Sequence, residues 1–129
     1  MDAKHYSFHE GGEILDQGTI DGLIELGGDD TGLLLELIGL FLDDAGERVD
    51  QIVEAGPKSD LDTIEKMAHA LKSASANIGA LGFSLRCKEL EANARDGQTG
   101  AVAGMVINFK GMYDELGNAL IELKSSHSA

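Results

Sequence analysis

The side chains best suited to chemistry in this sequence are its four histidines, His5, His9, His69 and His127. A neutral imidazole can act near neutral pH as a nucleophile, a proton carrier or a metal ligand. His5 and His9 have the i, i+4 spacing of a helical metal site, but no helical pattern surrounds them, so a loose tail is the simpler interpretation. His127 is interpreted in the same way, because it lies close to the end of the chain. His69 is the histidine that we expect on a regular element.

A helix is predicted over residues 60–78, and His69 lies in the middle of it. Apolar or small residues recur there at alternating steps of three and four, which is typical of a helix with one buried face. At about 100° per residue, His69 points about 130° away from the centre of that face, into solvent. Asp62, Lys66 and Ser73 lie on the same outer side. The predicted buried face consists of Leu61, Ile64, Ala68, Leu71, Ser75 and Ile78.

The neighbours of His69 suit it to carrying a phosphoryl group. A phosphorylated imidazole bears a dianionic group, and the cation of Lys72, at i+3, can reach it. Ser73 at i+4 and Ala76 at i+7 are small, so that a partner could approach the imidazole closely. An exposed neutral imidazole can serve as the nucleophile without a catalytic triad in its own chain. The spacing is equally consistent with an ordinary surface histidine beside a solvated lysine.

The same spacing predicts further helices before and after this one, and together they indicate the fold. One short and four longer helices joined by brief connections predict an all-α protein, an antiparallel four-helix bundle with an additional short N-terminal helix. The further helices cover residues 16–26, 31–55, 81–96 and 99–124. Their expected core positions include Leu34, Ile38, Phe41, Ala45, Val49 and Ile52, then Phe83, Cys87, Leu90 and Ala94, then Val102, Met105, Phe109, Met112, Leu116 and Leu120.

The ends of these helices are marked by residues that favour caps and turns. Asp16 is a candidate N-cap for the first helix. Gly56 is expected as the C′ residue of the second, because a following proline cannot continue a helix. Ser59 and Asp62 resemble a capping box at the start of the helix over residues 60–78. The other stops are placed at Gly27-Gly28, Gly79 and Gly97.

Length and composition suit a single domain. The chain has 129 residues, of which 43% are hydrophobic, so one packed core is expected. Residues 13–125 are assigned to the helical domain, and residues 1–12 and 126–129 to flexible tails.

The charge of the chain restricts its partners and its location. Formal net charge is −13, from 23 acidic and 10 basic residues. This charge repels nucleic acid and anionic membrane surfaces, so neither is expected as a partner. The one cysteine cannot form an intramolecular disulfide. No apolar stretch has the length of a signal peptide or of a membrane span, which predicts a cytoplasmic protein.

The residues around His69 carry a family resemblance. The stretch His69-Ala70-Leu71-Lys72-Ser73, continued by Ala74-Ser75-Ala76-Asn77-Ile78-Gly79-Ala80, resembles the His-x-Leu-Lys-Gly signature, with a downstream glycine, of histidine-containing phosphotransfer (HPt) domains. The likeness extends from about residue 14 to residue 123. It includes Leu15-Asp16, Phe41-Leu42 and Cys87-x-x-Leu90-Glu91. Two departures are Ser73, where the family usually has glycine, and Phe83, where leucine is more typical.

The resemblance implies a function and a set of roles. His69 would accept the phosphoryl group, Lys72 would assist electrostatically, and Gly79 would let the next turn pass close. The partners would be response-regulator receiver domains, with a hybrid sensor histidine kinase as a further candidate. The receiver would supply the Mg²⁺, so that no cofactor of the chain's own is expected. The docking surface is predicted to comprise Asp62, Lys66, Ser73, Ala76 and Gly79.

The sequence also bears on what the protein would not do. It contains neither a Walker A loop nor a kinase-type glycine loop, so a phosphocarrier of this kind is expected to have no ATP-binding or kinase activity of its own. A monomer is expected, because all four long helices of the bundle are found within one chain. Two alternatives are a non-catalytic helical adaptor in which His69 is incidental, and a dimerisation-type bundle with phosphotransferase function.

Overall fold

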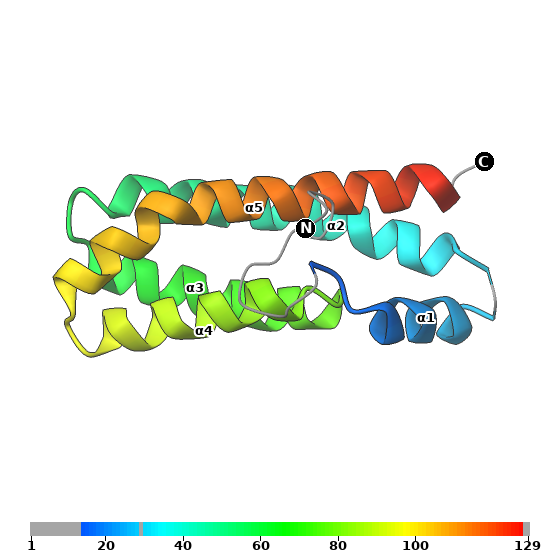
Figure 1. Ribbon diagram of the computed structural model, residues 1–129, viewed down its shortest axis with the longest axis horizontal. Coiled ribbons are helices and arrows are strands. Elements are labelled where there is room, and N and C mark those ends of the chain that lie inside the picture. Colours follow the sequence, from blue (N-terminus) through cyan, green and yellow to red (C-terminus); the bar gives the residue numbers. More distant parts are fainter. Residues whose placement is uncertain (1–13, 29, 128–129) are drawn as a thin grey trace, which may run out of the picture.

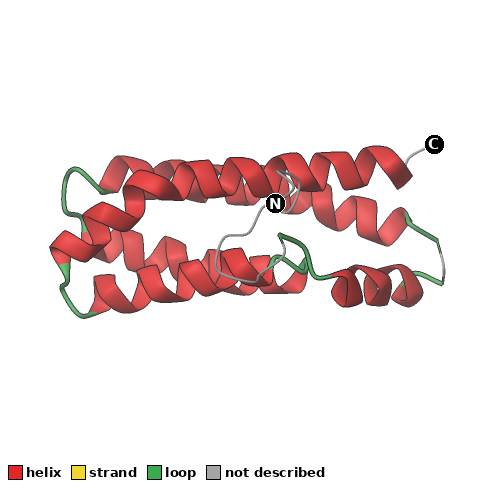
Figure 2. Ribbon diagram, viewed as in Figure 1, coloured by secondary structure: helices red, strands yellow, loops and turns green. Residues whose placement is uncertain are grey.

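The computed structural model describes residues 14–28 and 30–127, and within them every regular element is a helix (Figure 2). The tail predicted over residues 1–12, with His5 and His9, lies outside the described residues. The helices are α1 (Gln17–Leu26), α2 (Gly32–Ala55), α3 (Leu61–Asn77), α4 (Leu81–Arg95) and α5 (Thr99–His127). Each bound agrees with the predicted one to within a residue, except at the end of α5.

The four long helices form the predicted antiparallel bundle. In Figure 1, α2 lies beside α5 and α3 beside α4, as two layers packed on each other. Short connections reverse the chain between successive long helices, and α5 returns to pack along α2. The most extensive packing joins α3 to α4, and His69 lies on this pair.

The short helix α1 completes the bundle at the end where α2 and α5 extend furthest. These two helices have 24 and 29 residues, against 17 in α3 and 15 in α4. At 1.5 Å per residue, α5 is therefore about 18 Å longer than α3. Helix α1 lies in line with the α3–α4 layer and contacts the first half of α2 (Figure 1). Ile14 and Ile20 are buried there.

Asp16 fixes the start of α1, as predicted from its type. Its carboxylate accepts hydrogen bonds from the backbone N–H of Thr19 at 2.9 Å and from the Thr19 hydroxyl at 2.7 Å. These bonds lower the pKa of the Asp16 carboxyl below its ordinary value. The backbone N–H of Asp16 donates to the carbonyl oxygen of Gly79 at 2.7 Å. Helix α1 is thereby attached to the turn between α3 and α4.

Most of the predicted core is confirmed. All expected core positions of α2 and α4 are buried, and in α3 only Leu61 is partly exposed. In α5 Met105 and Met112 are partly buried and pack against the core, whereas Val106, which was not among the expected positions, is buried. Val106 lies against Gly56, whose missing side chain leaves room for it.

Two predicted helix ends were wrong in detail. The N-cap of α3 is Asp60, which accepts from the Thr63 backbone N–H at 3.2 Å. Ser59 has a φ of 54°, so it turns the chain and does not form the predicted capping box with Asp62. Gly56 has a helical φ of −53°, so it is not a left-handed C′ residue. A side chain there would place Cβ 2.8 Å from Cγ1 of Val106, so close packing explains this glycine.

The predicted C-terminal tail over residues 126–129 was also wrong in part, since α5 continues through His127. No glycine or proline follows Lys124 to stop the helix. Leu123 packs against the core, and the Thr31 hydroxyl donates to the carbonyl oxygen of His127 at 3.4 Å. Residues 128 and 129 lie outside the described residues. None of the helices in the described part of the chain is long and apolar enough to cross a membrane.

The turn at Gly79 gives a test of this packing. Gly79 and Gly97 have φ values of 84° and 73°, where side chains are strained. A Cβ on Gly79 would also lie 3.1 Å from Cβ of Thr19, whereas one on Gly97 would meet nothing within 4 Å. We expect Gly97→Ala to lower the free energy of unfolding by about 1 kcal/mol, and Gly79→Ala by about 2–4 kcal/mol. Urea titration measures both, and equal losses would contradict a close approach of α1.

Candidate functional site

His69 lies within helix α3 and its side chain faces solvent, as the spacing of apolar residues predicted. It lies near the middle of α3, between Ala68 and Leu71, both of which are completely buried. The His69 side chain itself is 65% exposed. The core therefore holds the backbone in place while the imidazole remains accessible to a partner.

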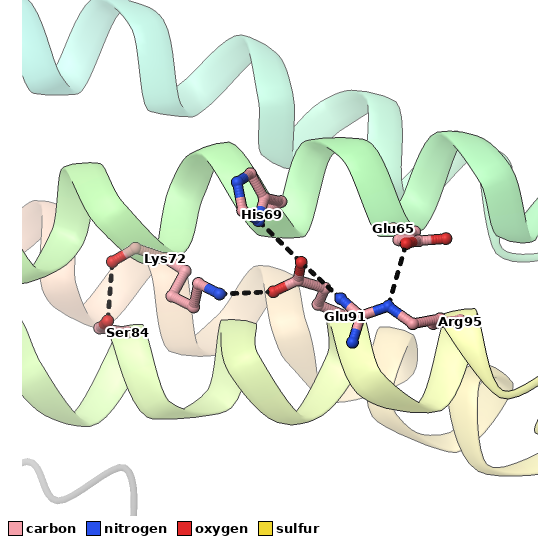
Figure 3. Close-up of polar contacts among 6 residues, drawn as sticks. All are labelled: Glu65, His69, Lys72, Ser84, Glu91 and Arg95. Carbon is pink, nitrogen blue, oxygen red and sulfur yellow. Dashed lines mark hydrogen bonds and ion pairs between the residues drawn. The ribbon is translucent and has the colours of Figure 1, made fainter.

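A buried carboxylate from the neighbouring helix holds the ring. Glu91 projects from α4 toward α3, and its side chain is only 5% exposed. Its Oε2 lies 2.7 Å from Nδ1 of His69, and its Oε1 accepts from Nζ of Lys72 at 2.8 Å. Figure 3 shows the carboxylate between the two side chains, with the other ring nitrogen of His69 pointing away from it.

The bond to Glu91 decides which nitrogen of His69 carries the proton. An ionised carboxylate can only accept hydrogen bonds, so Nδ1 of His69 must be the donor. In the neutral ring Nε2 is then unprotonated, with its lone pair directed away from Glu91 (Figure 3). The site thus presents a nucleophilic nitrogen on an exposed ring of fixed orientation.

Burial and hydrogen bonding shift the pKa of Glu91 in opposite directions. Burial acts to raise the pKa of this carboxyl, because it disfavours the charged form. Hydrogen bonds from Lys72 and His69, together with their charges, outweigh the effect of burial. The pKa of Glu91 consequently lies below the ordinary value for a glutamate. At neutral pH the carboxylate is ionised and can accept from Nδ1 of His69.

The contacts continue beyond these three residues. Nη2 of Arg95 lies 2.9 Å from Oε2 of Glu91, and Nε of Arg95 lies 3.3 Å from Oε2 of Glu65 on α3 (Figure 3). The Ser84 hydroxyl donates to the backbone carbonyl oxygen of Lys72 at 2.7 Å. Among the described residues, these contacts thus link two cations and two carboxylates to the His69 site, so that their charges balance although the whole chain is acidic.

Comparison with known proteins decides the family. The sequence profile of the Hpt domain matches residues 36–124, most of the chain, including α3 and α4. The chain belongs to the Hpt domain family. Histidine-containing phosphotransfer protein B (HptB) from Pseudomonas aeruginosa PAO1 has a similar crystal structure, with a TM-score of 0.79 and 23% identity, covering 90% of this chain and 98% of that one. No curated protein matches the sequence.

Membership of the Hpt family settles the general function. Hpt proteins are phosphotransfer carriers of phosphorelays, and they interact with receiver domains and kinases. This Hpt chain is accordingly a histidine phosphotransfer protein of a phosphorelay. The all-α bundle predicted from the sequence is confirmed as the Hpt fold.

The predicted site residues of this Hpt domain do not all lie together. Lys72 and His69 both bind the carboxylate of Glu91. The Lys72 ammonium is therefore in an ion pair and is not simply solvated. Ser73 is exposed and Ala76 is partly buried on the outer side of α3. Asp62 and Lys66 are exposed and pair with each other at 3.0 Å, two turns and one turn before His69. Within the described residues, three of these four positions are exposed and Ala76 is partly exposed.

Gly79 was predicted to lie on the docking surface, but it is not accessible there. It is buried, and Thr19 and Asp16 of the α1 region lie against it. A partner therefore cannot reach it while α1 is in place. The family resemblance implied that Gly79 lets the next turn pass close, whereas the atoms that lie against it here belong to Thr19 and Asp16 of the α1 region.

Sequence reasoning missed Glu91, Arg95 and Glu65 as site residues. The signal for Glu91 was its place beside Leu90, on the buried side of the helix over residues 81–96. Glutamate is almost never fully buried unless it is paired, so a carboxylate at such a position implies a partner. No comparable signal marked Glu65 or Arg95, which occupy partly exposed positions. Among the described residues, no three His, Cys, Asp or Glu side chains are grouped to bind a metal ion.

The lowered pKa of Glu91 predicts a pH-dependent stability. A carboxyl whose pKa is lower in the folded state stabilises the protein above its unfolded pKa, about 4.3 for glutamate, and loses this effect as the pH falls through its folded pKa. We expect Glu91→Gln to lower the free energy of unfolding by about 1–3 kcal/mol at pH 7. The difference from wild type should shrink below about pH 4.

Urea titrations of both proteins between pH 7 and pH 3 measure this difference. Glu36→Gln, an exposed glutamate on α2, is the matched control and should change stability little at any pH. A Glu91→Gln deficit that stays constant down to pH 3 would contradict the assignment of Glu91 as an ionised, paired carboxylate.

Proposed function

We propose that this Hpt protein accepts a phosphoryl group on Nε2 of His69 from the aspartyl phosphate of a receiver domain and passes it to the aspartate of another receiver. One observation carries the proposal. The exposed ring of His69 is held through Nδ1 by the buried carboxylate of Glu91, at 2.7 Å, so that Nε2 is free. The family supplies the reaction class, and this geometry supports the choice of residue and atom.

The transfer itself needs little from the phosphocarrier beyond position and charge. The lone pair of Nε2 attacks phosphorus, the N–P bond forms, and the P–O bond to the receiver aspartate breaks to release a carboxylate. The ring gains positive charge as the bond forms. Glu91, already hydrogen-bonded to Nδ1–H, stabilises that charge without moving. In the reverse direction the same steps return the phosphoryl group to an aspartate.

Lys72 supports the same reaction electrostatically. Its ammonium lies 2.8 Å from Oε1 of Glu91, on the carboxylate that also holds His69. The cation is thus near the ring without blocking it, and can interact with the anionic phosphoryl oxygens. Because Lys72 also pairs with a buried carboxylate, we expect its replacement to affect stability more than that of a solvated lysine.

The partner would complete the site. We infer that the receiver supplies Mg²⁺ and its acidic pocket, while this chain supplies the imidazole and no ATP-binding site. Asp62, Lys66, Ser73 and Ala76 would form the docking surface around His69. A hybrid sensor kinase is a further candidate partner, and we infer a cytoplasmic, monomeric protein that does not bind nucleic acid or membranes.

The acceptor is tested by labelling. We expect a phosphorylated receiver to label the wild-type chain on one histidine, with an acid-labile and base-stable adduct. His69→Gln should lose the label, because its amide cannot act as the nucleophile. The control combines His5→Gln, His9→Gln and His127→Gln in one chain, which should be labelled at the wild-type rate. Mass spectrometry under basic conditions and radiolabel transfer measure both.

Two outcomes would refute the assignment. Label retained by His69→Gln but lost by the triple variant would move the acceptor to another histidine. A folded wild-type chain that no receiver of the same organism can label would instead favour the helical adaptor.

The docking surface is tested by enlarging small residues on the outer side of α3. Ser73→Trp and Ala76→Trp should each slow transfer tenfold or more, about 1.4 kcal/mol of transition-state free energy, because a receiver must approach within bonding distance of His69. Ser73 is exposed, so Ser73→Trp should keep the wild-type melting temperature. Ala76 is partly buried, so its variant also requires a check of helix content.

Ser73→Gly, which restores the usual family residue, should transfer at least as fast as wild type. A glycine inside a helix costs about 0.5–1 kcal/mol of stability. If folded Ser73→Trp and Ala76→Trp both accept phosphate at the normal rate, the partner docks elsewhere.

A further inference from the structure

Arg95 links the two helices of the site through two carboxylates. It lies on α4 one turn after Glu91, and its Nη2 donates to Oε2 of Glu91 at 2.9 Å. Its Nε donates to Oε2 of Glu65 at 3.3 Å, and Glu65 lies on α3 one turn before His69. Figure 3 shows these contacts as a series that runs from His69 to Glu91, from Glu91 to Arg95, and from Arg95 back to Glu65 on α3.

We propose that Arg95 is a positioning residue for the phosphoryl acceptor: held by Glu65, it fixes the carboxylate of Glu91 so that Oε2 stays against Nδ1 of His69. The inference rests on the proposed function of His69. Arg95 itself does not contact the ring in the structure, so its effect passes through Glu91.

The two carboxylate oxygens of Glu91 have different donors. Oε2 accepts from both His69 and Arg95, whereas Oε1 accepts from Lys72 alone. The terminal torsion of a glutamate is broad and roughly two-fold, so donors, not the side chain itself, set the plane of the carboxylate. Lys72 carries a compact ammonium that can donate to either oxygen. Without Arg95, the carboxylate could turn toward Lys72 and lose its contact with His69.

Arginine is suited to this role, and a lysine would be a weaker substitute. The guanidinium is planar and presents donors in fixed directions, so one group can bind carboxylates on two helices at once. The contact with Glu65 directs the plane of the Arg95 guanidinium, and that plane in turn directs Oε2 of Glu91. A flexible ammonium would bind either carboxylate but would not fix the orientation of one relative to the other.

The orientation of Glu91 matters because it selects the tautomer of His69. With Oε2 at Nδ1, the proton stays on Nδ1 and the lone pair of Nε2 is available. When that contact is lost, the ring can also adopt the tautomer with the proton on Nε2. In that form the nitrogen that attacks phosphorus is blocked, so the rate of transfer falls although the ring is still exposed.

An ordinary surface ion pair is the competing explanation. The Arg95 side chain is 56% exposed, and exposed ion pairs often do no more than tether two helices. A tether would change the melting temperature without changing the tautomer of His69. The same exposure makes Arg95 replaceable without disturbing the core, so the two explanations can be separated by experiment.

The test compares Arg95→Met, which keeps the apolar stem, with Arg95→Lys and with Lys110→Met. Lys110 is an exposed cation on α5 in an i, i+4 ion pair with Asp114, and serves as the matched control. The ring tautomer of His69 is measured by ¹⁵N NMR at pH 8, from the chemical shifts of its two ring nitrogens. Transfer from a saturating phosphorylated receiver and the melting temperature are measured on the same proteins.

We expect Arg95→Met to show a clear population with the proton on Nε2 and to transfer about five- to tenfold more slowly. Arg95→Lys should lie between it and wild type, and Lys110→Met should match wild type in tautomer and rate. An unchanged tautomer in Arg95→Met overturns the proposal, whatever happens to the rate or the melting temperature. A changed tautomer with an unchanged rate overturns it as well.

Failure of the proposed function would look different. If His69→Gln still accepts phosphate, the acceptor assignment fails. The NMR comparison does not depend on transfer, and it would still report whether Arg95 controls the contact between Glu91 and His69.

Discussion

The carboxylate of Glu91 is buried between α3 and α4, and a buried charge is costly unless opposite charges and hydrogen bonds offset the loss of water. Here the donors come from His69 and Lys72 on one helix and from Arg95 on the other. The two helices must therefore keep a fixed distance and rotation, or the charge is left without partners. This requirement connects the packing of the bundle to the geometry of His69, the proposed acceptor.

The rest of the fold keeps that helix pair in place. Helices α2 and α5 cover one side of it, and the buried aromatic rings of Phe83 and Phe109 stack at 5.0 Å between α4 and α5. Helix α1 is attached to the turn between α3 and α4 by the hydrogen bond from Asp16 to Gly79. Burial of apolar surface in these contacts stabilises the folded state and offsets the free-energy cost of burying the Glu91 carboxylate.

Much of this arrangement could be predicted from the sequence, because amphipathic spacing records which side of each helix is buried. The spacing around His69 correctly placed its ring in solvent, and glycines correctly marked most helix ends. Contacts between helices were not predictable in the same way. The reach of Glu91 to His69 depends on the relative rotation of α3 and α4, and the burial of Val106 depends on a close approach to Gly56. The cap at Asp60 depends on the backbone conformation of the preceding residue.

A phosphocarrier needs a nucleophile that is both exposed and held in one orientation. Its nucleophile must be exposed enough for a second protein to reach it, yet a solvated side chain samples several rotamers and both tautomers. In this chain the two demands fall on different residues, since the ring of His69 is exposed while the group that orients it is buried. Because the helix fixes one end of the side chain and Glu91 holds Nδ1, a receiver that docks here as proposed would meet a ring already in position. The ordering entropy is then lost during folding and not during transfer, which is how the proposed acceptor could contribute to the rate of phosphoryl transfer.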